Sequence, residues 1–161
     1  MFTVKAGYSD TIELKSGIDQ VRDFFADLQN FADMMPGISN IHIDAKGLAH
    51  WTIKAEIPVV GSIMQKFDVQ LVENTEDRVE WLPVTAEKQN FLRYAADFLE
   101  KAENLTVVKF AQFVELRRNS ARELHLLAGL AGEGFINKEM TRRVSEMIRI
   151  FIRRAKEKLE K

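Results

Sequence analysis

The sequence predicts an α+β fold in which a curved antiparallel β-sheet of about seven strands grips a long C-terminal α-helix. Three observations lead to this prediction. Apolar residues between 135 and 159 recur every three or four positions, which is the period of one helix face. Residues 38–118 instead alternate between apolar and polar side chains, as strands with one dry face do. The stretch 17–35 has helical spacing but room for only two short helices.

The N-terminal part is predicted as a strand followed by these two short helices. Residues 2–8 and 11–15 alternate between apolar and polar side chains and are expected to be extended. Ser16 is the expected N-cap of the first helix, with Asp19 three residues later as a variant of the capping box. Pro36 ends the second helix, because proline disfavours helix in the residue before it.

The middle of the chain is predicted to form about six strands. Turn residues at 46–47, 61–62 and 74–77 separate the shorter ones, and two longer strands near 89–102 and 105–118 are joined by a turn at 103–104. Seven strands at ~4.8 Å spacing form a sheet roughly 30 Å wide, whereas a helix is only about 10 Å across. The sheet must therefore curl around the helix, and this leaves an interior space between them.

The composition is that of an ordinary globular protein. The 161 residues carry a net charge of −1 and include no cysteine, which excludes disulfides and thiolate chemistry. The length favours one domain over residues 1–161. The first residues lack the basic and apolar regions of a signal peptide, and no run is long enough to span a membrane, so a cytoplasmic location is expected.

The order strand, two helices, six strands and long helix, with Pro36-Gly37 after the helix pair, resembles the START-like helix-grip superfamily. The segments 24–28, 35–38 and 51–54 are similar to proteins related to the G-type subunit of carbon monoxide dehydrogenase. This superfamily also includes polyketide cyclase/dehydrase-like proteins and lipid-transfer domains. The resemblance implies a cavity between sheet and helix that holds a small hydrophobic ligand.

The resemblance also implies which side chains would surround that ligand. The wall would come from Trp51, Ile53, Phe67, Val69, Trp81, Tyr94, Phe98 and Phe113 on the sheet and from Met140, Val144, Met147 and Phe151 on the helix. The entrance would lie near Phe31, Met34, Met35 and Pro36. At each of these positions, ordinary core packing is the alternative to ligand contact.

Polar candidates are few. Arg93 and Asp97 share one strand face and could anchor a ligand headgroup, and His125 could reach a cavity mouth; solvent exposure is the alternative for all three. His42 and His50 fall on the polar phase of their strands and are expected to face water. No histidine pair has ligand spacing with a carboxylate, so no metal site is expected, and no catalytic residue or cofactor is assigned.

The leading hypothesis is binding or transport of a lipid, isoprenoid or aromatic polyketide-like molecule without catalysis. A polyketide cyclase or dehydratase using the same cavity is one alternative, and it would need two polar side chains converging on the ligand. Another is an accessory protein that docks on a membrane or a partner enzyme. Residues 138–161 carry nine Lys/Arg and four Glu, a basic face that could contact an anionic membrane. The glycines in 129–134 are expected to form a flexible link, and no nucleic-acid partner is expected.

Overall fold

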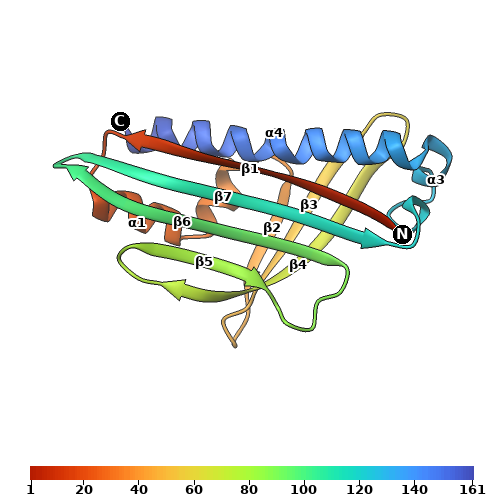
Figure 1. Ribbon diagram of the computed structural model, residues 1–161, viewed down its shortest axis with the longest axis horizontal. Coiled ribbons are helices and arrows are strands. Elements are labelled where there is room, and N and C mark those ends of the chain that lie inside the picture. The colour runs from red at the N-terminus through yellow and green to blue at the C-terminus, as the bar shows by residue number, and fades with distance from the viewer.

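A seven-stranded antiparallel sheet curls around one long helix in the computed structural model, which describes residues 1–161 (Figure 1). This confirms the predicted helix-grip architecture. The elements are β1 (Phe2–Leu14), α1 (Ile18–Ala26), α2 (Gln29–Met34), β2 (Ile38–Ile43), β3 (Ala49–Ile57), β4 (Gly61–Asn74), β5 (Arg78–Pro83), β6 (Asn90–Ala102), β7 (Leu105–Arg118), η1 (Ala121–Glu123), α3 (Ala128–Ala131) and α4 (Glu133–Leu159).

The strands lie in the order β1-β7-β6-β5-β4-β3-β2, so β1 and β2 are the two edges. Helix α4 runs along β1 and also contacts β3 across the sheet (Figure 1). Helices α1 and α2 lie at the end of the sheet where α4 finishes, and α3 lies at the opposite end, next to the N-terminus (Figure 1). The interior between sheet and α4 therefore has an α1–α2 end and an α3 end.

Two local predictions at the N-terminus are wrong. The strand does not break at residues 9–10, because β1 pairs with β7 without interruption from Phe2 opposite Arg118 to Leu14 opposite Thr106. Ser16 does not cap α1: its hydroxyl donates to Gln20 Oε1 at 2.8 Å, and the N-cap position is Gly17. Pairing with β7 keeps residues 9–10 extended despite their sequence, and the bond to Gln20 occupies the Ser16 hydroxyl that was expected to cap the helix.

Helix α4 begins at Glu133, two residues before the predicted start, and buries the expected apolar stripe: Ile136, Met140, Val144, Ile148, Phe151, Ile152 and Ala155. The link before it holds two short helical segments, η1 and α3. Gly132, with φ of +96°, separates α3 from α4. This left-handed conformation suits glycine and lets the chain change direction between two helices.

A row of polar side chains fastens α4 to the open edge of β1. Asn137 Nδ2 donates to the carbonyl of Thr3 at 2.7 Å, and Thr141 Oγ1 donates to that of Lys5 at 3.0 Å. Ser145 Oγ accepts from the N–H of Gly7 at 3.3 Å. Residues four apart share a helix face, so these three side chains bond to backbone groups at every second residue of β1. They thereby cover a strand edge that could otherwise pair with another chain.

Candidate ligand-binding interior

The inner face of the sheet carries most of the predicted wall. The residues buried there are Trp51, Ile53, Phe67, Val69, Trp81, Tyr94 and Phe98, and α4 buries Met140, Val144 and Phe151. Met147 is partly buried and packs against the edge of this core. The strands place these residues by alternation, since every second side chain points toward α4. Their contact with a ligand stays a prediction.

Phe113 does not belong to the interior. On β7 the even-numbered residues from Thr106 to Arg118 are buried, whereas Phe113 has the opposite phase and is 43% exposed on the outer face. Its ring lies over Gly7 of the neighbouring strand, where a Cβ would overlap it. The prediction failed because β7 carries aromatic residues on both faces.

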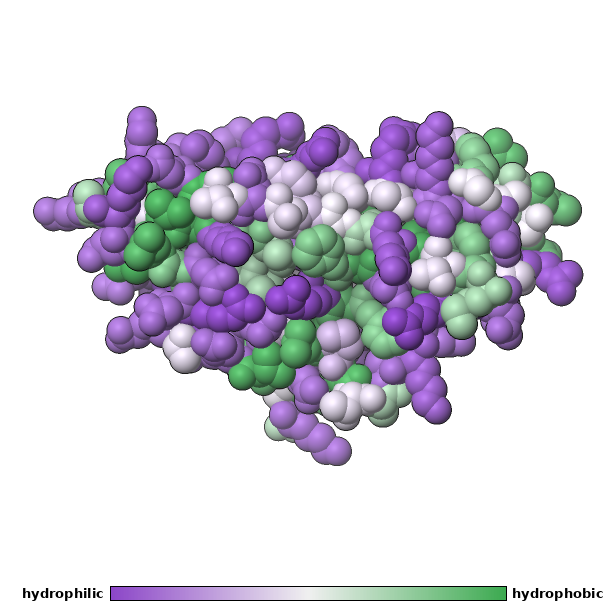
Figure 2. Space-filling view, in the orientation of Figure 1, coloured by the Kyte–Doolittle hydropathy of each residue, from purple (hydrophilic) through white to green (hydrophobic).

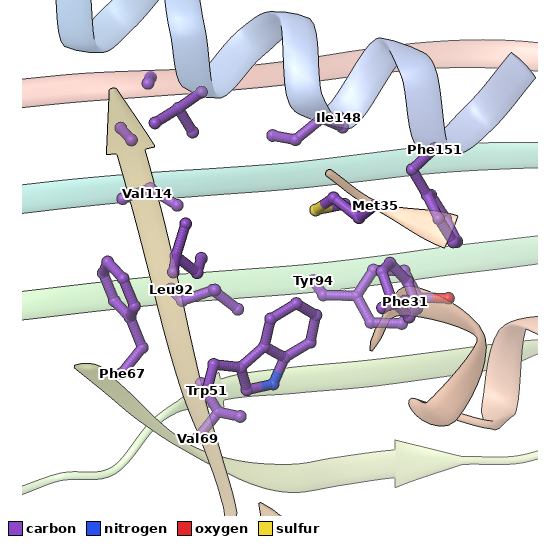
Figure 3. Packing of buried hydrophobic residues seen from close by; sticks show 14 of the residues in the cluster. Phe31, Met35, Trp51, Phe67, Val69, Leu92, Tyr94, Val114, Ile148 and Phe151 are labelled. Atoms are coloured by element: carbon purple, nitrogen blue, oxygen red, sulfur yellow. The ribbon is translucent and has the colours of Figure 1, made fainter. Parts of the chain in front are cut away.

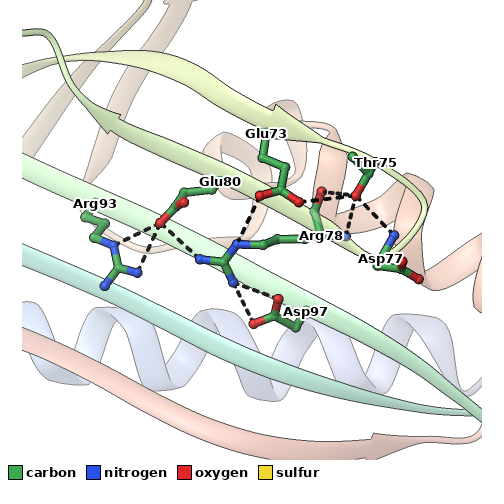
Figure 4. A network of polar contacts seen from close by, with 7 residues as sticks. All are labelled: Glu73, Thr75, Asp77, Arg78, Glu80, Arg93 and Asp97. Atoms are coloured by element: carbon green, nitrogen blue, oxygen red, sulfur yellow. Dashed lines mark hydrogen bonds and ion pairs between the residues drawn. The ribbon is translucent and has the colours of Figure 1, made fainter.

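Arg93 and Asp97 also lie on the outer face, so they cannot anchor a ligand inside. Arg93 bonds to Glu80 Oε2 at 3.0 Å, and both oxygens of Asp97 accept from Arg78 Nη1 at 2.7 Å. Figure 4 shows that these residues form one network of ion pairs across β5 and β6. The network is a solvated cross-strand arrangement, the alternative that the sequence left open.

The three histidines lie outside the interior. His125 is partly exposed in the turn before α3, where its Nδ1 accepts from the N–H of Leu127 at 3.1 Å. His50 is on the outer face as expected, but it is not free: its ring nitrogens contact Asp68 Oδ1 at 2.6 Å and Asp44 Oδ2 at 2.8 Å. These two carboxylates raise the pKa of His50.

The α1–α2 end of the interior is packed with aromatic rings (Figure 3). Phe31 stacks on Phe151 with ring centroids 4.1 Å apart and meets the edges of Tyr94 at 4.7 Å and Trp51 at 5.3 Å. The hydroxyl of Tyr94 donates to the carbonyl of Phe25 at 2.8 Å, and burial raises the pKa of this tyrosine well above its ordinary value. The interior is therefore solid at this end.

The predicted entrance lies in this packed region. Phe31 and Met35 are buried, and Met34 and Pro36 are only partly exposed. A ligand entering here would have to separate the stacked rings of Phe31 and Phe151. Pro36 borders a surface groove together with Gly37 and Met147, and an entrance at this end stays a prediction.

The α3 end contains a small void. Its volume is about 20 Å³, and it is lined by Ile53, Ala55, Ile63, Gln65, Phe67, Val114, Leu116, Met140 and Val144. Eight of the nine are apolar. A space of this size holds about one water molecule, so the interior is nearly filled by its own side chains.

A polar cluster adjoins this void and was missed by the sequence reasoning. Arg118 Nη2 donates to Gln65 Oε1 and to Asn90 Oδ1, both at 2.7 Å, and Asn90 Nδ2 donates to Gln65 Oε1 at 3.0 Å. Arg118 and Asn90 are each only 9% exposed. The signal was present in the sequence: Arg118 shares the dry phase of its strand with Leu116, and Gln65 shares that of Phe67.

Solved structures with this architecture are numerous, although no protein-family profile and no curated protein matches the sequence. The di-domain aromatase/cyclase BexL from the BE-7585A biosynthetic pathway superimposes with a TM-score of 0.63 at 18% identity. That match covers 98% of this chain and 51% of BexL, so the chain spans about half the length of the di-domain protein. The chain has the START-like helix-grip fold.

Other helix-grip structures agree along most of their own length. The aromatase/cyclase ZhuI from Streptomyces sp. R1128 gives a TM-score of 0.56 at 10% identity, over 91% of this chain and 92% of ZhuI. A START superfamily protein from Mycobacterium smegmatis gives 0.53 at 13% identity, over 86% and 99%. At these identities the likeness concerns the fold, and the site must be argued from this chain's own residues.

Three buried polar atoms on the inner face of this helix-grip sheet have no hydrogen-bond partner: Trp51 Nε1, Trp81 Nε1 and Gln112 Oε1. Gln112 is 1% exposed and lies opposite Tyr94 in the middle of the sheet. Buried polar groups are normally paired, and an unpaired one costs about 1–3 kcal/mol. The inner face therefore offers hydrogen-bonding groups that its own fold does not use.

The outer surface of this helix-grip chain has an apolar region at the α3 end. Leu126 is 72% exposed and Leu130 is 84% exposed, and Figure 2 shows apolar side chains gathered at that end of the molecule. Four of the eight basic residues of α4 pair with glutamates along the helix, as Arg142 does with Glu139 at 2.7 Å. None of the helices has the length and apolar character needed to span a membrane.

Proposed function

We propose that the chain binds a small apolar molecule between the inner face of the sheet and the first half of α4. The observation that carries this proposal is the void at the α3 end, with its eight apolar lining residues. The unpaired polar atoms of Trp51, Trp81 and Gln112 further along the same face support it, because they could meet the polar groups of an amphipathic ligand.

Binding requires the interior to open, since the void holds about one water molecule. Two of its walls, Met140 and Val144, belong to the first half of α4. Methionine is unbranched and adapts readily to a new shape, so displacement of Met140 enlarges the space at low cost. A ligand that buries about 300–400 Å² of apolar surface gains about 8–10 kcal/mol, from which several kcal/mol of association cost are lost.

Entry at the α3 end is part of this proposal. The void lies at this end, and the exposed Leu126, Leu127 and Leu130 belong to the segment that precedes α4. At the opposite end, the stacked pair Phe31 and Phe151 blocks access. The segment 119–134 would then control entry, in place of the entrance that the sequence predicted near Phe31.

The test is mass spectrometry of protein purified without detergent, first native and then after denaturing extraction. A stoichiometric apolar molecule that dissociates on unfolding supports the proposal. Val144→Phe, which fills the void with a larger ring, should purify without it, and Leu99→Phe on the exposed outer face should retain it. An empty wild-type protein that also fails to bind fluorescent lipid probes would contradict the proposal.

A cyclase or dehydratase acting in the same interior is a second candidate, favoured by the likeness of the fold to two proteins described as aromatase/cyclases. It needs polar side chains within reach of the ligand, and Gln65 and Arg118 are the pair beside the void. Conversion of a bound polyketide mimic that is lost in Gln65→Leu would support the enzyme. Binding without conversion would support the carrier.

A further inference from the structure

Arg118 is a buried cation without a carboxylate partner. Its four hydrogen bonds go to neutral oxygens: Gln65 Oε1 and Asn90 Oδ1 at 2.7 Å, the carbonyl of Arg117 at 2.8 Å and that of Gln89 at 3.4 Å. Glu87 and Glu123 act on it only at a distance, since no carboxylate oxygen lies within 4.0 Å of its nitrogens. Burial lowers the pKa of Arg118.

Such a group is costly for the fold. A buried charge is normally paired with an opposite charge, because removing it from water is unfavourable even after the surroundings relax. An apolar residue at the end of β7 would continue the dry phase of Val114 and Leu116 without that cost. The position therefore makes sense if the cation meets an anion that is not part of the protein.

Gln65 connects this charge to the interior. It lines the void, and its Oε1 is held by two donors, Arg118 Nη2 and Asn90 Nδ2. The amide is therefore fixed with its oxygen toward the cluster and its nitrogen turned away, and no protein acceptor bonds to that nitrogen. Gln65 therefore brings to the lining of the void an amide whose N–H groups have no protein acceptor and whose oxygen is bonded to a cation.

We propose that this cluster of Arg118, Asn90 and Gln65 binds the carboxylate of an apolar ligand, so that the chain selects apolar carboxylic acids. Gln65 Nε2 donates to a carboxylate oxygen, and the guanidinium of Arg118 balances the charge. One cation matches a monoanion, whereas a phosphate dianion would need more donors than this wall supplies. The inference rests on the proposed function, because the apolar chain of the acid would occupy the opened interior.

The experiment compares decanoate with 1-decanol, which have the same chain length and different headgroups. Binding is followed by the intrinsic fluorescence of Trp51 and Trp81 at about pH 8, where the acid is ionised. The wild type should bind decanoate about 10- to 100-fold more tightly than decanol, as expected for a hydrogen bond to a charged group. Arg118→Gln and Gln65→Leu should bind both ligands with similar affinity.

Arg93→Gln is the matched control, because it removes the same charge from the outer face and should keep the preference. Near-ultraviolet circular dichroism checks that each variant is folded; if Arg118→Gln is not, Gln65→Leu decides the outcome. Equal binding of acid and alcohol by the wild type, or a preference retained in Gln65→Leu, would overturn the headgroup inference alone. Failure of the wild type to bind either ligand would instead count against the proposed function.

Discussion

At the α1–α2 end of the interior, aromatic rings from α1, α2, β3, β6, β7 and α4 stack and meet edge to face, and the hydroxyl of Tyr94 is bonded to a backbone carbonyl. At the α3 end, aliphatic side chains and Met140 surround a void beside Gln65 and Arg118. The aromatic contacts at the first end stabilise the packing there. The second end is less tightly packed and more polar, which is why we propose that the ligand binds there.

The largest expected difference between the two ends is in truncation of the α4 side chains. Phe151→Ala should lower the free energy of unfolding by about 3–5 kcal/mol, because it removes a ring stacked on Phe31. Met140→Ala should cost about 2–3 kcal/mol and should leave decanol binding intact or stronger. Urea unfolding measures both, and equal losses would show that the two ends are packed alike.

Loss of the buried Tyr94 hydroxyl should have an intermediate effect. Tyr94→Phe leaves the carbonyl of Phe25 without its donor at 2.8 Å in a fully buried place, which costs about 1–2 kcal/mol. Tyr8→Phe is the matched control, since its hydroxyl bonds to Asp10 in solvent and its loss should change stability by less than about 0.5 kcal/mol. Urea unfolding measures both losses of stability. Equal losses in the two variants would contradict the tight packing of the α1–α2 end.

Enlarging a side chain should change the stability of the protein in opposite directions at the two ends. Val144→Ile adds one methylene group beside the void and should stabilise the protein by up to about 0.8 kcal/mol, while weakening decanol binding. Val108→Ile adds the same group at a fully buried site that pairs with Phe98 and should destabilise by about 1 kcal/mol or more through overpacking. Thermal unfolding of the two variants provides the test, and destabilisation by Val144→Ile would mean that the void cannot accept the methylene.

The smallest expected effect is a pH dependence that belongs to neither end. The pKa of His50 is raised from 6.5, chiefly by Asp44 and then by Asp68, and His50 in turn lowers the pKa of Asp44. The histidine contribution is complete below about pH 6.5 and is lost as the pH rises through the raised pKa. The Asp44 contribution is present above about pH 3.8 and is lost as the pH falls through the lowered pKa.

His50→Gln should therefore lower stability most at about pH 5–6 and progressively less at higher pH. Because His50 lies on the outer face, behind Trp51 on the same strand, ligand affinity should not change. Urea titrations across this pH range measure the first effect. A constant difference between wild type and variant at all pH values would show that the two carboxylates do not shift its titration.

The sequence predicted the order and type of the elements because hydrophobic periodicity is a strong signal in long segments such as β7 and α4. It misplaced Phe113 because both phases of β7 carry a large aromatic residue, and only pairing with Gly7 decides which one faces out. Arg118 was missed, although its position two residues after Leu116 places it on the buried phase of β7.

The polar row of Asn137, Thr141 and Ser145 has a consequence for how the protein could open. Sliding of α4 along its axis would break all three hydrogen bonds to β1 together, since they share one register. Rotation about the β1 edge would keep them and would separate α4 from β3 and from α2, including the stacked rings of Phe151 and Phe31. One side of α4 is thus held to β1 by hydrogen bonds. The other side faces β3 and β4 through apolar contacts, and the void, Gln65 and Met140 lie there.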